Sequence, residues 1–286
     1  MTALDKRLNA YRSDLADIRL QGSVEANDFV EGTRARVNAP VLDLRNAPHQ
    51  EAGIDTQLLL GDAVTLFEEA DGYAWVQAER DLYVGYVAAA HLAPQSAPAT
   101  HLVAVPRTFV YREADMKKRA MRALSLGNEV RVVGSATTRG TDYAFLESGE
   151  ALIAGHLQPL GSVVQDYVSV AESLERTPYL WGGKSAFGID CSGLVQLSMR
   201  MAGRNVLRDS DMQEQSIGTL LGVGQNLSGL KRGDLVFWKG HVAIMVDEET
   251  MIHANGHTMM VSREGLRDAV DRIGYLYGQP TSFRRP

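Results

Sequence analysis

The chain contains a single cysteine, Cys191, which is the strongest nucleophile among its side chains. This residue follows a run of glycines in the stretch "YLWGGKSAFGIDCSGLVQ". A thiol reacts as its thiolate, and a helix N-terminus and a nearby imidazolium both lower the pKa of a thiol. Apolar residues recur at helical spacing from Cys191 to Ala202, and Asp190 stands where an N-cap belongs. The sequence therefore predicts Cys191 in the first turn of a helix, although a lone cysteine is often only a small buried hydrophobe.

Two histidines on a predicted hairpin could supply the imidazole. The segment 241–255, "HVAIMVDEETMIHAN", predicts two strands joined by the three-residue loop DEE. This loop length pairs Ala243 with His253 and makes His241 and His253 diagonal neighbours on one face. The other face is then almost entirely aliphatic, which favours this register over one with a longer loop. Cys191, His241 and His253 thus have the residue types of a nucleophile, a general base and an orienting group.

A zinc site is the alternative for the same three residues. Cysteine and histidine both bind zinc, but the sequence has no closely spaced ligand pair such as CxxC or HExxH. A thiol hydrolase without a metal or other cofactor is therefore the favoured interpretation. The remaining histidines are predicted to be surface or structural residues: His49, His91, His101, His156 and His257.

The pattern of the chain predicts a multidomain protein in which the reactive residues lie in the last domain. Residues 4–20 carry apolar positions at roughly helical spacing and predict one docking helix in an N-terminal helical segment over 1–31. Short alternating runs broken by Gly, Pro and Asp predict a first SH3-like barrel over 32–95. A linker rich in Pro, Ala and Ser follows over 93–100.

A weaker copy of the barrel pattern follows the linker. "LLLGDAVTLF" (58–67) aligns with "LSLGNEVRVV" (124–133), and "AAHLAP" (89–94) aligns with "AGHLQP" (154–159). The offset is close to 65 residues in both alignments. This internal repeat predicts a second small all-β SH3-like barrel over 101–160.

The pattern changes again in the last part of the chain, over 162–286. Helical spacing over 162–175 and 191–202 is followed by short apolar runs typical of strands, "DLVFW", "HVAIMV" and "MIHAN". One helix packed on an antiparallel sheet is an α+β domain. This domain is where the chemistry is expected.

Composition limits the kinds of partner. The chain has 286 residues, 45% of them apolar and 22% charged, with a net charge of −6. It has no dense block of Lys and Arg, so we expect neither a nucleic acid nor a membrane surface as partner. The N-terminus lacks the apolar core of a signal peptide, and no apolar run reaches 18 residues. These features predict a cytoplasmic protein, and they leave its oligomeric state open.

Four stretches resemble the motif set of the NlpC-type cell-wall cysteine peptidases, which have a papain-like fold. They are "PYLWGGKSAFGIDCSGLVQ", "LKRGDLVFW", "GHVAIMV" and "MIHANG", in the order found in the family. The resemblance implies Cys191 as the nucleophile, His241 as the general base and His253 as the third, orienting residue. The two predicted barrels resemble bacterial SH3-like domains. This combination is seen in the subgroup that cleaves γ-D-glutamyl bonds to a diamino acid in peptidoglycan peptides.

The resemblance also implies a pocket for the free amine of an N-terminal L-Ala. Asp190 and Ser192 flank the nucleophile and would hold this amine. The first barrel would add an acid and a tyrosine, for which Asp55 and Tyr83 are the best candidates. Tyr179 would line the cleft. The segment "RDSDMQEQ" (208–215) also resembles a family segment, to which we assign no role.

The expected activity is a cysteine peptidase that cleaves L-Ala-γ-D-Glu-diamino acid peptides during murein recycling. Two alternatives remain open at this stage. One is a secreted hydrolase of intact peptidoglycan, and the other is a wall-peptide binding module with an inert papain-like domain. The sequence does not determine which diamino acid is preferred.

Overall fold

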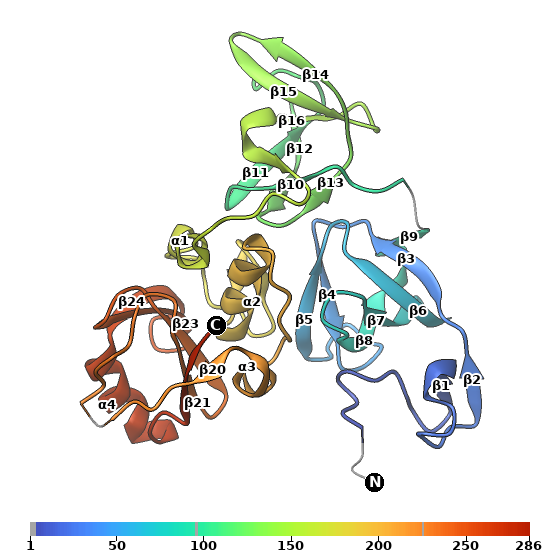
Figure 1. The fold of residues 1–286 in the computed structure, drawn as a ribbon. Coiled ribbons are helices and arrows are strands. Elements are labelled where there is room, and N and C mark those ends of the chain that lie inside the picture. The colour runs from blue at the N-terminus through green and yellow to red at the C-terminus, as the bar shows by residue number, and fades with distance from the viewer. Residues whose placement is uncertain (1–3, 95–96, 225) are drawn as a thin grey trace. The chain divides into compact units, whose positions relative to one another are not determined.

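The computed structural model describes residues 4–94, 97–224 and 226–286, and the chain divides into two compact units, Met1–Leu160 and Gly161–Pro286 (Figure 1). No helix in these described stretches is long and apolar enough to cross a membrane.

Parts of four predicted segments lie outside the described residues. These parts are residues 1–3 of the N-terminal segment, residue 95 at the end of the first barrel, residues 95–96 of the linker, and residue 225 of the last domain.

The predicted docking helix over 4–20 is wrong, because the described part of this segment contains no α-helix. It contains the strand β1 (Leu15–Asp17) and the 3-10 helix η1 (Ile18–Leu20). β1 pairs in parallel with β2 (Asp28–Val30), which follows the segment. Polar side chains bond to nearby backbone groups and so compete with helical hydrogen bonds. Asn9 Nδ2 donates to Asp5 O at 2.8 Å, and the Asp17 carboxylate accepts from Arg19 N at 2.9 Å. Helical spacing of apolar residues alone did not overcome this competition.

A seven-stranded antiparallel sheet follows, in the order β5-β4-β8-β7-β6-β3-β9. Its elements are β3 (Thr33–Val37), β4 (Val41–Arg45), β5 (Ile54–Leu59), β6 (Ala63–Ala70), β7 (Tyr73–Ala78), β8 (Val84–Ala88), the 3-10 helix η2 (Ala89–His91) and β9 (Leu92–Pro94). Buried and partly exposed residues alternate along β4 and β8, as expected for strands with one face on a core. The N-terminal segment adds Ala10 to a cluster with Phe67 and Trp75.

The same strand order recurs over 101–159. A five-stranded sheet has the order β12-β11-β16-β15-β14, and a three-stranded sheet has the order β13-β10-β17. The elements are β10 (His101–Val103), β11 (Arg107–Tyr111), β12 (Ala120–Ser125), β13 (Glu129–Val130), β14 (Val132–Thr138), β15 (Thr141–Leu146), β16 (Ala151–Ile153), the 3-10 helix η3 (Ala154–His156) and β17 (Leu157–Pro159). The strand corresponding to β6 is divided into β13 and β14.

One turn shows the repeat in atomic detail. The Asp62 carboxylate accepts from Leu59 N at 2.8 Å, and the Asn128 side chain accepts from Ser125 N at 2.9 Å. Both side chains close the turn in the aligned "LLLGD" and "LSLGN" segments, after a glycine with positive φ. The second group of strands therefore repeats the first in order and in turn chemistry, while its assignment as an SH3-like domain stays a prediction.

The second unit is built on a six-stranded antiparallel sheet in the order β20-β25-β21-β22-β23-β24. Its strands are β18 (Lys184–Ser185), β19 (Gly188–Ile189), β20 (Thr219–Leu220), β21 (Leu235–Trp238), β22 (His241–Met245), β23 (Thr250–Asn255), β24 (Met260–Gly265) and β25 (Ser282–Arg285), of which β18 and β19 form a separate pair. Its helices are α1 (Tyr167–Ser173), α2 (Cys191–Met201), α3 (Ser210–Ser216) and α4 (Leu266–Tyr277). The α+β class agrees with the prediction.

The helix content exceeds the two helical stretches that the sequence pattern predicted over 162–175 and 191–202, because α3 and α4 were not predicted. α2 contacts β22 and β23. α4 packs Leu266, Ala269 and Ile273 in one cluster with Met245 and Met251 of the sheet. Both faces of the β22–β23 hairpin are consequently buried, not only its aliphatic face.

The predicted register of this hairpin is confirmed. Met245 lies opposite Met251 in the ladder, and Val246 N donates to Thr250 O at 2.9 Å. Residues 247–249 form the connecting loop, so the loop length that places His241 and His253 on one face is the one observed.

Candidate active site

Cys191 is the first residue of α2, as predicted. Asp190 is the N-cap, and its side chain accepts from Gly193 N at 2.7 Å. The Cys191 side chain is 7% exposed. The backbone amides of Ser192 and Val242 face its sulfur, and Val242 directly follows His241 in the chain. The nucleophile therefore lies where the start of α2 meets the start of β22.

A buried arginine fixes the start of α2. The two Arg208 Nη atoms donate to the two Asp190 oxygens at 2.9 and 2.7 Å, and Arg208 Nη1 also donates to Ser192 Oγ at 2.7 Å. The Asp190 carboxylate accepts a further backbone hydrogen bond from Gly182 N at 2.9 Å. Arg208 is 1% exposed. With Gly193 N included, four short hydrogen bonds occupy the roughly four lone-pair positions of the carboxylate.

This network changes the interpretation of Asp190 and Ser192. We expected both to hold the amine of the substrate, but an ammonium would have to displace a hydrogen bond that Asp190 already accepts. The structure favours a positioning role for Asp190, with the Ser192 hydroxyl engaged by Arg208. The sequence did not identify Arg208. The segment 208–215 resembled a family segment, and that resemblance was the only available signal.

The glycines before and after Cys191 allow a close backbone approach. A Cβ on Gly193 would lie 2.3 Å from Gly183 O, and a Cβ on Gly183 would lie 2.6 Å from Gly188 O. These distances are shorter than carbon–oxygen contacts in folded proteins allow. The turn that leads to the nucleophile can therefore press against the first turn of α2 only because these positions lack side chains.

His241 and His253 are brought together, as the hairpin register predicted. His241 Nε2 lies 2.9 Å from His253 Nδ1, and the two ring centroids are 5.1 Å apart. His253 is fully buried, while His241 keeps partial exposure beside Trp238, at 5.7 Å between ring centroids. Because Nε2 of His241 is engaged by His253, Nδ1 is the nitrogen left to exchange a proton with the thiol.

The cysteine and its candidate base both rest in the neutral form. Burial, followed by the charge of Asp190, raises the pKa of the Cys191 thiol to about 12. The amides of Val242 and Ser192 act in the opposite direction. Burial, followed by the neighbouring His253, lowers the pKa of His241 to about 3. Both pKa shifts therefore favour a neutral thiol and a neutral imidazole at neutral pH. If Cys191 attacks a substrate with His241 as its base, the thiol proton would pass to His241 during that step.

Beyond His253 lies an acid that sequence reasoning missed. Glu264 Oε2 is 3.2 Å from His253 Nε2. The two atoms are close enough for an ion pair, but they are not aligned as a hydrogen bond. Arg272 of α4 donates to both Glu264 oxygens at 2.8 and 2.6 Å. Burial opposes ionisation of Glu264, but its bonds to Arg272 and His253 hold its pKa at about 2.

Tyr179 lies beside the nucleophile. Burial, followed by the negative charges that Cys191 and Asp190 would carry, raises the pKa of Tyr179 well above its usual value. Tyr179 is partly exposed, which fits the predicted cleft-lining position, although its contact with a substrate stays a prediction. Trp181 of the same motif is 71% exposed.

Asp55 and Tyr83 both belong to the first compact unit. Asp55 lies on β5 and is partly exposed. Tyr83 lies between β7 and β8 and is 4% exposed, with its backbone amide donating to Asp81 Oδ1 at 3.2 Å. Their predicted role in binding the substrate amine stays a prediction.

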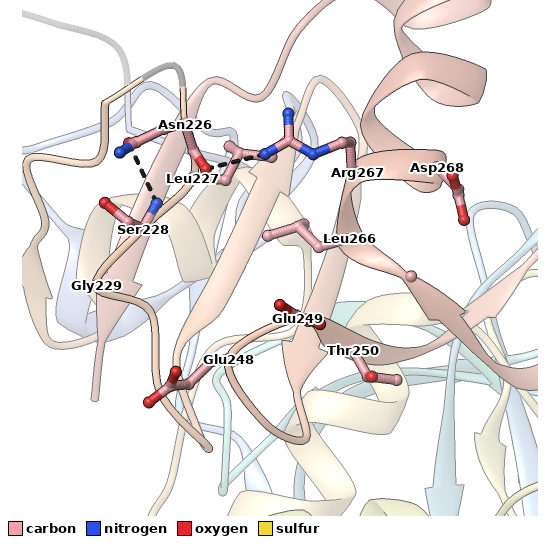
Figure 2. A pocket seen from close by; sticks show the side chains of 11 residues that line it. Asn226, Leu227, Ser228, Gly229, Glu248, Glu249, Thr250, Leu266, Arg267 and Asp268 are labelled. Carbon is pink, nitrogen blue, oxygen red and sulfur yellow. Dashed lines mark hydrogen bonds between the residues drawn. The ribbon is translucent and has the colours of Figure 1, made fainter.

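Among the described residues, no group of three or more His, Cys, Asp or Glu side chains is arranged to hold a metal ion. A pocket of about 510 Å³ lies elsewhere in the second unit (Figure 2). Its lining includes Glu248, Glu249, Arg267 and Asp268 but none of the three predicted catalytic residues. Arg267 Nη2 donates to Asn226 O at its rim at 3.1 Å.

Comparisons with known proteins show which families two regions of the chain resemble. The profile described as "NlpC/P60 family" matches residues 176–270, and the profile described as "Bacterial dipeptidyl-peptidase Sh3 domain" matches residues 44–92. The chain is 26% identical over 274 residues to "Dipeptidyl-peptidase 6" of Lysinibacillus sphaericus, which covers 85% of this chain and 99% of that protein.

Two other similarities add detail. "Gamma-D-glutamyl-L-lysine dipeptidyl-peptidase" of Bacillus subtilis (strain 168) is 34% identical over 98 residues, which are 32% of this chain and 31% of that protein. A solved structure of an NlpC/P60 family protein from Bacillus cereus ATCC 10987 superposes with a TM-score of 0.72 at 20% identity, and the match covers 88% of this chain and 99% of that one. At this identity the superposition establishes a shared fold. The chain therefore contains an NlpC/P60 domain over residues 176–270, preceded by a bacterial dipeptidyl-peptidase SH3 domain over residues 44–92.

Proposed function

We propose that this protein hydrolyses the bond between γ-D-glutamate and a diamino acid in peptidoglycan-derived peptides that begin with a free L-Ala. The observation that carries the proposal is Cys191 at a helix start beside a hairpin that joins His241 to His253. The relatives support the type of bond, because one of them is named for its action on γ-D-glutamyl-L-lysine. The preferred diamino acid and a role in murein recycling belong to the proposal.

The geometry fits a two-step thiol mechanism. The sulfur of Cys191 attacks the γ-carbonyl carbon of the D-Glu residue while the thiol proton passes to His241 Nδ1. Backbone amides near the start of α2 stabilise the oxyanion. His241 then gives its proton to the departing amine of the diamino acid, which leaves a thioester on Cys191. Water attacks the thioester and loses a proton to His241. The dipeptide L-Ala-γ-D-Glu leaves as the thiol regains its proton.

Selectivity for a free amine would separate this activity from hydrolysis of the intact wall. In the intact wall the L-Ala amine is joined to muramic acid and cannot act as an ammonium. Asp55 and Tyr83 remain the candidates for the acid and the hydroxyl that would bind it, because Asp190 is already saturated. A charge-assisted hydrogen bond from the ammonium to a carboxylate is the expected contact.

The test is incubation of the protein with L-Ala-γ-D-Glu-diaminopimelate and chromatographic detection of free diaminopimelate. We expect release by the wild-type protein and none by Cys191→Ala. Absence of release by the wild type, or equal release by Cys191→Ala, would overturn the proposal.

A second substrate tests the amine requirement. The same peptide with N-acetyl-L-Ala should be cleaved at least about tenfold more slowly, since one charge-assisted contact contributes roughly 1.5–3 kcal/mol. Asp55→Asn and Tyr83→Phe should raise KM for the free peptide and leave the slow cleavage of the acetylated peptide unchanged. Equal cleavage of both peptides, or release of fragments from whole sacculi at a similar rate, would favour a hydrolase of the intact wall.

We also propose that the protein acts in the cytoplasm, where it would meet small peptides already freed from the wall. Cell fractionation of the native organism with an antibody to this protein is the direct test. Recovery in the culture medium or the envelope fraction would contradict this location without affecting the proposed bond specificity.

A further inference from the structure

His253 has a polar neighbour close to each of its ring nitrogens. Its Nδ1 lies 2.9 Å from His241 Nε2, and its Nε2 lies 3.2 Å from Glu264 Oε2. The ring is fully buried, so water does not compete for either nitrogen. Glu264 therefore forms the third member of a row of side chains that runs from His241 through His253.

The position of Glu264 follows from the register of the sheet. His253 lies opposite Ser262 in the β23–β24 ladder, and Met251 lies opposite Glu264. Glu264 is thus a diagonal neighbour of His253 on the same face of the sheet, close enough for a long side chain to reach. The acid is the penultimate residue of β24 and lies two residues before α4 begins.

A second element immobilises the acid. Arg272 of α4 binds Glu264 in a bidentate manner and donates two hydrogen bonds, at 2.8 and 2.6 Å. Such two-point pairing fixes the plane of a carboxylate as well as its position. One Glu264 oxygen, Oε2, is shared by Arg272 Nη2 and His253 Nε2. Glu264 is therefore held in place, and its ionised carboxylate can only accept hydrogen bonds from the neighbouring side chains.

From this arrangement we propose that Glu264, held by Arg272, is a positioning residue that sets the tautomers of both active-site histidines. An ionised carboxylate accepts hydrogen bonds only, so His253 carries its proton on Nε2. Its Nδ1 is then an acceptor, which requires the His241 proton on Nε2. His241 Nδ1 is left with a free lone pair, the state in which it can take the proton of the Cys191 thiol.

The replacement Glu264→Gln keeps the shape of the side chain but adds a hydrogen-bond donor, so the hydrogen-bond pattern of the two histidines can reverse. A glutamine can turn its NH₂ group toward His253 Nε2, and His253 then carries its proton on Nδ1 and donates it to His241 Nε2. The His241 proton moves to Nδ1, the nitrogen needed as the base. The expected defect is a base in the wrong tautomer, comparable to loss of the orienting carboxylate in a serine-protease triad.

The charges around the pair give a second signature. The groups that act on His241 are His253 and Arg272, which disfavour its protonation, and Glu264, which favours it. Around His253, Glu264 favours protonation while Arg272 and His257 disfavour it. Removal of the Glu264 charge should therefore shift the acid limb of kcat/KM toward lower pH while the plateau falls. A packing defect would lower the plateau without shifting that limb.

The first experiment needs no variant and no substrate. NMR of the full chain labelled with ¹⁵N-histidine reports which nitrogen of each ring carries the proton. We expect both His241 and His253 to be protonated on Nε2 in the wild type. A spectrum with His253 protonated on Nδ1 would overturn the inference, whether or not the variants fold. This test stands apart from the proposed function, because failure to cleave the muropeptide would leave the tautomers unchanged.

The second experiment rests on the proposed peptidase activity. Glu264→Gln should lower kcat by about 10- to 100-fold with KM within about twofold, the size expected for loss of a partner that orients a histidine. Glu264→Asp, which keeps the charge, should recover part of the loss, and Arg272→Met should cause a smaller one. Glu175→Gln is the matched control, since Glu175 pairs with Arg263 of β24 at 3.2 Å without reaching the histidines. Wild-type kcat and unchanged tautomers in folded Glu264→Gln would contradict the inference.

Discussion

At the scale of single residues, the site keeps its two reacting groups neutral until a substrate arrives. Burial raises the pKa of Cys191 and lowers that of His241, so both shifts disfavour a preformed thiolate–imidazolium pair. The helix start and two nearby amides act the other way on the thiol, but the burial outweighs them. In the proposed mechanism, Cys191 would therefore be activated by proton transfer to His241 during attack.

This state predicts how Cys191 reacts with a small alkylating agent. The rate constant with iodoacetamide should stay low through neutral pH and rise only on the alkaline side, because thiolate forms only there. Since Cys191 is the only cysteine, mass spectrometry of the wild-type chain measures this one site without background. His241→Ala should change the profile little. A rate plateau beginning near pH 4 in the wild type, and lost in His241→Ala, would instead demonstrate a resting ion pair.

At the scale of secondary-structure elements, the ion pair between Asp190 and Arg208 fixes the N-terminus of α2. Asp190 directly precedes Cys191 in the chain. Asp190 and Arg208 are almost fully buried, at 7% and 1% exposure. Gln213 of α3 adds a bond to the same turn, since its Nε2 donates to Ser192 O at 3.0 Å. The position of a reactive residue at a helix start depends on the hydrogen bonds that hold the first turn of that helix.

Loss of the arginine should destabilise the catalytic unit strongly. Arg208→Met leaves the buried Asp190 carboxylate without its cation, and breaking a buried pair in this way costs about 3–5 kcal/mol. Arg232→Met is the matched control. Arg232 pairs with Asp166 at 2.7 Å, but the two side chains are 39% and 45% exposed. The control should therefore lower the free energy of unfolding by no more than about 1 kcal/mol. Urea denaturation of both variants measures the difference, and equal losses would refute the positioning role.

The same scale separates what the sequence predicts from what it does not. The N-cap Asp190 and the β22–β23 register were predictable, because the residue types along each element repeat with the period of a helix or a strand. The helix over 4–20 was predicted wrongly on the same kind of spacing, since local bonds such as that from Asn9 to Asp5 decide short segments. The contacts of Arg208 with Asp190 and of Glu264 with His253 join different elements. These contacts depend on tertiary packing, and the spacing of residue types along one element does not predict which other element it will contact.

At the scale of the whole molecule, the buried histidines couple the active site to stability. The pKa values of His241 and His253 lie below the ordinary value in the folded protein, chiefly because both rings are buried. The unfolded chain therefore binds more protons than the folded chain once the pH falls below the ordinary histidine pKa of about 6.5. Above that pH these histidines do not reduce the free energy of unfolding. The free energy of unfolding decreases as the pH falls below about 6.5, and it continues to decrease down toward pH 3, the approximate pKa of His241 in the folded protein.

Calorimetry can isolate this effect in the intact chain. The Tm of the second unit should fall between about pH 7.5 and about pH 5, and His253→Asn should reduce the size of that fall because one of the proton-binding groups is gone. Asparagine at 253 can also lower Tm at every pH through lost packing, so the measured quantity is the difference between the two Tm values. His49→Asn, at an exposed histidine in the first unit, should keep the wild-type difference. If His253→Asn leaves the fall in Tm as large as in the wild type, neutral burial of His253 does not contribute to acid sensitivity, and the electrostatic description of the site fails at that residue.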